Sequence, residues 1–177
     1  MNNTQKLINI AMFIALGIIL PVAFHFVGAG GSVFLPMHIP VFMAGMLLGV
    51  KSGLAAGVLT PVLSSLLTGM PPLMPILPVI IVELGVYGAL VGYLYRHCHL
   101  SLLGSLFGAM VVGRLAAAVI VAVLTMLVGV KMQPLTYLIG TVSTGLPGIV
   151  IQLIFIPLLV KKLEAVSVTF RQVKSRE

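Results

Sequence analysis

The chain has 177 residues, of which 60% are hydrophobic and only 7% are charged. Ordinary soluble domains carry about 25% charged residues, so this composition excludes a water-soluble protein and indicates that a lipid bilayer is the solvent. The formal net charge of +7 does not indicate nucleic-acid binding, because the basic residues are spread along the chain at the ends of apolar runs.

The apolar runs are continuous rather than alternating, which favours membrane-spanning helices over the strands of a barrel. We predict one all-α integral membrane domain over residues 1–177, with six transmembrane helices and a polar cytoplasmic tail at 161–177. A membrane span takes about 20 residues, so the second and third predicted helices are shorter than a usual span. In chain order the six predicted helices cover 7–27, 39–50, 53–67, 74–95, 102–128 and 135–160.

Basic residues predict the orientation of these helices. If the N-terminus is inside, eight of the ten basic residues fall on the cytoplasmic side. Only Lys131 falls outside, and Arg114 lies within the fifth helix. Positive charge is typical of the cytoplasmic side, so we expect both termini in the cytoplasm.

Small residues recur at a spacing of four along several predicted helices, which places them on one helix face and lets backbones approach closely. We interpret the glycines as packing positions inside the bundle, and Ala11 with Ala15 as a candidate contact for a partner subunit. The glycines with this spacing are Gly45, Gly49, Gly53 and Gly57, then Gly88 with Gly92, and Gly104 with Gly108.

Motifs for metal, phosphate or nucleophilic chemistry are missing from the sequence. The nearest approach to a phosphate loop, 45–52, has the wrong glycine spacing and an extra residue before Lys51. His97 and His99 flank Cys98 in a predicted cytoplasmic turn, which we interpret as a solvated basic loop. We therefore expect a non-catalytic chain that holds no metal and no cofactor.

Two ionisable residues lie deep in the predicted helices. Glu83 is about 13 Å and Arg114 about 21 Å from the outer ends of their segments, at 1.5 Å per residue. Charges inside a membrane are costly and usually mark a pathway or a binding site. We expect the two to pair, directly or through a ligand; a purely structural ion pair is the alternative.

Other polar side chains gather in the outer half of the predicted bundle, around the depth of Glu83. Their concentration at one end predicts a polar cavity that opens outward, although serine and threonine in helices often bond to their own backbone. Gln152 lies deeper and is interpreted as a group that bonds across helices. The residues that form this candidate site are His38, Ser64, Ser65, Thr68, Tyr87, Tyr137, Thr141 and Thr144.

Four segments of the chain resemble a known family, the substrate-binding S-components of energy-coupling factor (ECF) vitamin transporters. The likeness in length, helix number and topology extends over nearly the whole chain. The segments that carry it are Leu35–Val41, Gly49–Gly53, Leu59–Pro72 and Glu83–Gly88.

The resemblance implies a division of labour between subunits. This chain would bind a vitamin from outside, in the plasma membrane of a prokaryote, and deliver it to one transmembrane coupling subunit and two ATPases that use ATP. The pair Ala11 and Ala15 resembles the alanine motif by which the first helix of such proteins docks on the coupling subunit.

The four segments named above are most similar to the branch of the family assigned to pantothenate, with the pyridoxine and hydroxymethylpyrimidine branches as alternatives. Arg114 would suit a carboxylate, because a guanidinium can bind one through two parallel hydrogen bonds. Glu83 or Tyr87 would then bind hydroxyl groups of the ligand. The residues alone also leave open a different class of protein, a self-sufficient carrier or small channel that uses Glu83 for proton coupling.

Overall fold

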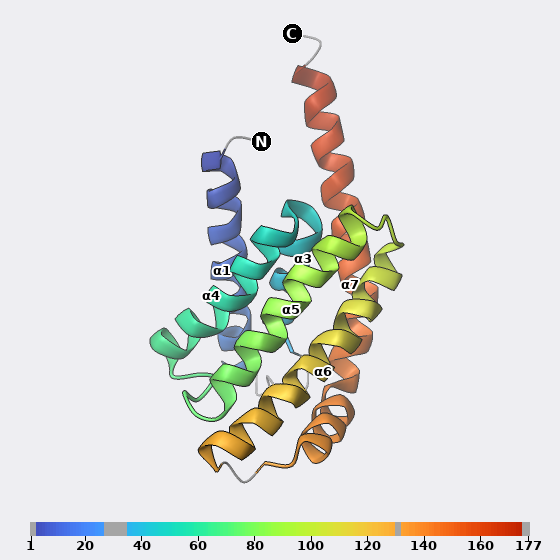
Figure 1. The fold of residues 1–177 in the computed structure, drawn as a ribbon. Helices are drawn as coiled ribbons and strands as arrows, with labels where there is room; N and C mark the ends of the chain where they lie inside the picture. The colour runs from blue at the N-terminus through green and yellow to red at the C-terminus, as the bar shows by residue number, and fades with distance from the viewer. Residues whose placement is uncertain (1–2, 27–34, 130–131, 175–177) are drawn as a thin grey trace.

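The computed structural model of the protein describes residues 3–26, 35–129 and 132–174. Most of the predicted first loop, together with Lys131 and the end of the tail, lies outside the described residues. Within those ranges the chain is all helical (Figure 1), which confirms the predicted fold class. The helices are α1 (Asn3–Phe26), α3 (His38–Leu48), α4 (Val50–Thr68), α5 (Ile76–Arg96), α6 (Leu102–Val128) and α7 (Pro134–Lys174).

Five of these helices, all except α3, are long and apolar enough to cross a membrane. The shortness predicted for the second helix is confirmed, because α3 has 11 residues. Helix α4, in contrast, has 19 residues and is longer than the predicted segment 53–67. The start of α1 and the end of α7 lie at the same end of the bundle (Figure 1), as an even number of crossings requires.

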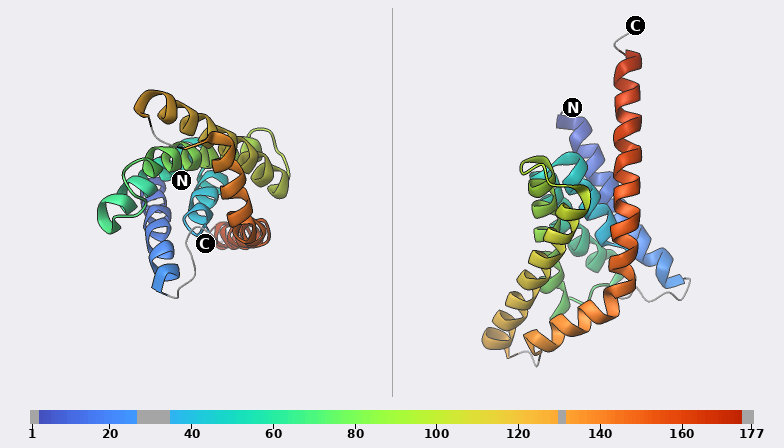
Figure 2. Two further views of the ribbon diagram at one scale, coloured as in Figure 1. Left: turned by 90° about the horizontal axis from the view of Figure 1, so that it is seen from below. Right: turned by 90° about the vertical axis from the view of Figure 1, so that its right-hand side faces the viewer.

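The last helix also differs from the prediction. Helix α7 continues through most of the predicted tail and ends at Lys174. A change to polar residues ends a membrane span, but it does not end the hydrogen-bonded ladder of a helix, so the two boundaries need not coincide. Figure 2 shows α7 bent in its orange part, and Pro147 lies inside this helix. Proline removes a backbone donor and is a common cause of such a kink.

Helix α5 is the centre of the bundle and packs against α3, α4 and α6. Glycines permit unusually close backbone approach there: a Cβ atom on Gly53 would overlap the carbonyl of Gly88, and one on Gly88 would overlap Gly53. Gly45 and Gly57 likewise face backbone carbonyls of α5. The interpretation of these glycines as internal packing positions agrees with this arrangement. We call Gly45, Gly53, Gly57 and Gly88 the glycine seam.

Gly49 has a different role from the rest of the series. It is the single residue between α3 and α4, and its φ of +95° is in a region that glycine enters without the steric cost of a side chain. Arg96 of α5 lies beside this break and donates from Nη1 to the carbonyl of Leu47 at 3.3 Å. The break therefore lies at Gly49, rather than at residues 51–52, between the predicted helices 39–50 and 53–67.

Candidate ligand-binding site

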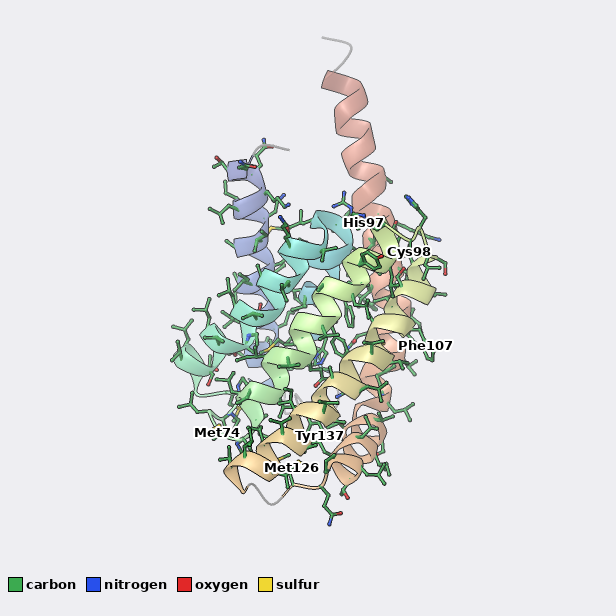
Figure 3. All side chains as sticks on the ribbon, in the orientation of Figure 1. Met74, His97, Cys98, Phe107, Met126 and Tyr137 are labelled. Carbon is green, nitrogen blue, oxygen red and sulfur yellow. The ribbon has the colours of Figure 1, made fainter. Side chains whose placement is uncertain are left out.

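A cavity of about 1080 Å³ lies among α1, α4, α5, α6, α7 and the start of α3. Figure 3 shows Tyr137, a lining residue, in the half of the molecule away from the chain ends, whereas His97 and Cys98 lie near the chain ends. Pockets for small molecules typically have about 300–1,000 Å³, so the cavity is large enough for a vitamin-sized compound. Its polar lining residues are His38, Ser64, Thr68, Glu83, Arg114, Thr136, Tyr137, Thr141 and Thr144.

An ion pair joins α5 to α6 at this cavity. Arg114 Nη1 lies 2.8 Å from Glu83 Oε1, and the two side chains are only 9% and 3% exposed. Tyr87 donates its hydroxyl to the same Glu83 oxygen at 2.7 Å. The pairing expected from the sequence is thus direct. Because two donors share Oε1, the carboxylate is held in one orientation.

Tyr87 lies next to the cavity rather than among its lining residues. Its ring is 2% exposed and stacks on Phe42, with ring centroids 5.0 Å apart. A tilted contact with His38 has a centroid distance of 5.4 Å. Gly113 of α6 leaves the space that this ring occupies, because a Cβ there would overlap it. Tyr87 is therefore placed to hold Glu83 and His38.

His38 begins α3 and lines the cavity. It is 8% exposed, and its Nδ1 atom is buried without a hydrogen-bond partner in the described part of the chain. Buried polar atoms are usually paired. The imidazole is held by its own backbone, by the ring of Tyr87 and by an interaction with the backbone of Leu35.

The hydroxyl groups at the end of α4 are engaged with backbone carbonyls. Ser64 donates to the carbonyl of Met70 at 2.8 Å, and Ser65 donates to that of Pro71 at 2.7 Å. Thr68 donates to the carbonyl of Ser64 at 2.7 Å. The bonds from Ser64 and Ser65 fix the loop between α4 and α5, whereas the bond from Thr68 lies within α4. Ser64 and Thr68 still line the cavity, whereas Ser65 does not.

The start of α7 supplies another wall. Thr141 and Thr144 line the cavity together with Tyr137, as expected from the sequence. The hydroxyl of Thr141 bonds to the carbonyl of Tyr137 at 2.9 Å, within its own helix. Sequence reasoning missed the apolar lining residues, because nothing distinguishes them in a chain that is apolar throughout. These include Pro21, Val22, Leu35, Met37, Ile76 and Ile80.

The fold and cavity define a helical membrane protein with a cavity of small-molecule size between its helices. Residues 5–160 match the family model described as "ECF transporter, substrate-specific component". The chain belongs to that family, and it is therefore a non-catalytic, substrate-specific component of an ECF importer. Comparisons with curated proteins and with solved structures gave no significant match.

Proposed function

We propose that this chain captures pantothenate and delivers it to an ATP-driven importer. The choice of ligand rests on how Arg114 is paired in the cavity. The ion pair with Glu83 uses one guanidinium nitrogen, Nη1, and one carboxylate oxygen. A guanidinium has five donors, so a ligand carboxylate can bind Arg114 while the contact with Glu83 is kept.

The remainder of the cavity suits the other parts of such a ligand. Pantothenate has an apolar dimethyl group next to its hydroxyls and amide. Apolar side chains such as Val22, Ile76 and Ile80 line the cavity together with hydroxyl-bearing and imidazole side chains. Mostly apolar walls with a few well-placed polar groups are typical of small-molecule sites.

The same ion pair favours a second candidate. Glu83 and Arg114 lie 2.8 Å apart and cancel each other's charge, so a neutral ligand would not disturb the balance. Pyridoxine and hydroxymethylpyrimidine are such ligands, and their hydroxyl and ring nitrogen atoms could bond to Glu83 and His38. Calorimetry can separate these alternatives.

We expect pantothenate to bind the purified protein in isothermal titration calorimetry, and Arg114→Ala to weaken that binding at least about 100-fold, because it removes charge-assisted hydrogen bonds. Lys162→Ala, which removes an exposed positive charge, should leave the affinity unchanged. Tight binding of pyridoxine or hydroxymethylpyrimidine with no pantothenate signal would overturn the assignment.

For transport, we propose that the chain acts with one transmembrane coupling subunit and two ATPases, which use ATP as their cofactor. It would lie in the plasma membrane of a prokaryote, with both termini in the cytoplasm. Helix α1 is the proposed docking element: Ala11 and Ala15 are exposed on it, whereas Phe13 and Ile14 are buried. Uptake into vesicles by the chain alone, without ATP, would contradict this scheme and favour a self-sufficient carrier or channel.

The substitution Ala11→Trp is expected to impair vitamin uptake by the assembled importer and to reduce co-purification of the coupling subunit. A bulky side chain on a face of small residues prevents close helix approach. Ligand binding by the isolated chain should be unchanged, because Ala11 is not among the cavity residues. Val119→Trp, on the exposed face of α6, is the matched control. Normal uptake by the Ala11→Trp importer would exclude this face from the interface.

A further inference from the structure

Gln152 is a buried polar residue in an otherwise apolar part of α7. It is only 1% exposed, and it does not line the cavity. Burying an amide is costly unless its hydrogen bonds are satisfied. Its Nε2 atom donates to the carbonyl of Leu35 at 3.3 Å, which links α7 to the segment before α3. The sequence suggested a bond across helices, but not this partner.

Leu35 has an unusual backbone conformation. Its φ is +49°, which is sterically unfavourable for a residue with a side chain and persists only where the surroundings enforce it. Its carbonyl accepts a second hydrogen bond, from the backbone N–H of His38 at 3.1 Å. The Leu35 carbonyl thus closes the turn 35–38 at the start of α3. The bond from Gln152 stabilises this carbonyl.

This turn determines where the imidazole of His38 lies. Nδ1 of His38 has no partner with full hydrogen-bond geometry in the described ranges. The imidazole contacts the Tyr87 ring, at a centroid distance of 5.4 Å, and it interacts with the backbone of Leu35. Without the bond from Gln152, the turn would lose one of the two hydrogen bonds at the Leu35 carbonyl.

We propose that Gln152 is a positioning residue for ligand recognition: through the Leu35 carbonyl it holds His38 at the cavity wall, where the imidazole bonds a hydroxyl group of the ligand. A hydroxyl both donates and accepts, so it can pair with either tautomer of the imidazole. The proposal rests on the proposed function, in that the cavity binds a small hydroxyl-bearing molecule. It assigns a role in binding to a residue outside the cavity.

The test is a double-mutant cycle in calorimetry, with pantothenate, pyridoxine and hydroxymethylpyrimidine as probes. Gln152→Met removes the donor at similar side-chain length and should weaken binding about five- to tenfold, the equivalent of about 1 kcal/mol for one hydrogen bond. His38→Ala should weaken binding at least as much. If Gln152 acts through His38, the double variant binds no more weakly than His38→Ala alone. Additive losses would overturn the proposal, because they show an effect independent of His38.

A second measurement needs no ligand. Diethyl pyrocarbonate labels accessible histidines, and mass spectrometry reports each site; the exposed His97 and His99 are internal standards. Loss of the bond from Gln152 should shift the turn 35–38 from a held toward a released state, and each 1.4 kcal/mol changes such an equilibrium tenfold. Labelling of His38 should therefore rise at least about threefold in Gln152→Met. It should stay at the wild-type level in Ser143→Ala, a change at an exposed α7 hydroxyl that bonds its own helix.

The two measurements distinguish the possible failures. If none of the three probes binds the wild type, the ligand assignment fails, and labelling alone decides the role of Gln152. Unchanged labelling of His38 in Gln152→Met would overturn that role even if pantothenate binds the wild type.

Discussion

Replacing Gly88 by alanine is expected to lower the free energy of unfolding by about 3 kcal/mol or more, at or above the upper end of the usual cost of overpacking. The added Cβ would overlap the carbonyl carbon and oxygen of Gly53. A flexible side chain could rotate away from such a contact, but these are backbone atoms of α4. Relief would therefore require α4 and α5 to separate, with loss of packing along the glycine seam.

Thermal unfolding in detergent micelles, followed by circular dichroism, measures this effect. Gly108→Ala is the matched control, because its new Cβ would meet only the far end of the Leu94 side chain, at 3.1 Å. Alanine is also the better helix former, so the control should unfold within about 1 kcal/mol of the wild type. Equal stability of the two variants would show that close approach at Gly88 does not hold the bundle together.

The fold was largely predictable because lipid allows so few backbone arrangements. Continuous apolar runs predicted six helices, and the structure has six in the part that it describes. The break between α3 and α4 was harder to place. It depends on a positive φ at Gly49, one of four evenly spaced glycines, and on the bond from Arg96 to Leu47, which are distant in sequence. Neither feature has a local sequence signal.

The candidate site was predictable where a residue was chemically unusual for its surroundings. Glu83 and Arg114 are charges within apolar helices, and their pairing is confirmed. The hydroxyls gave a weaker signal, because their partners depend on the loop conformation: Ser64 and Ser65 bond to carbonyls six residues further along the chain. Their contact with a ligand stays a prediction.

The second large effect is expected from Glu83→Gln. This change keeps the shape of the side chain but leaves Arg114 as an uncompensated charge that is 9% exposed. Removing one partner of a buried pair costs about 3–5 kcal/mol, so the unfolding temperature should fall sharply. Adding Arg114→Met removes the remaining charge, and this double variant should recover most of the lost stability. A double variant as unstable as Glu83→Gln would mean that the charge itself is not the cause.

The same variant tests the ligand, because an anion can replace the charge that Glu83→Gln removes. If the ligand is pantothenate, its carboxylate compensates the charge of Arg114 that the substituted side chain no longer balances, so the Glu83→Gln variant should bind it more tightly than the wild type does. A ligand at 100 times its Kd adds about 2.7 kcal/mol of stability, so pantothenate should raise the unfolding temperature of Glu83→Gln by several degrees and leave the double variant unchanged. A neutral ligand such as pyridoxine would lose a partner at Glu83 and gain nothing at Arg114. Stabilisation of Glu83→Gln by pyridoxine but not by pantothenate would therefore contradict a carboxylate-binding role for Arg114.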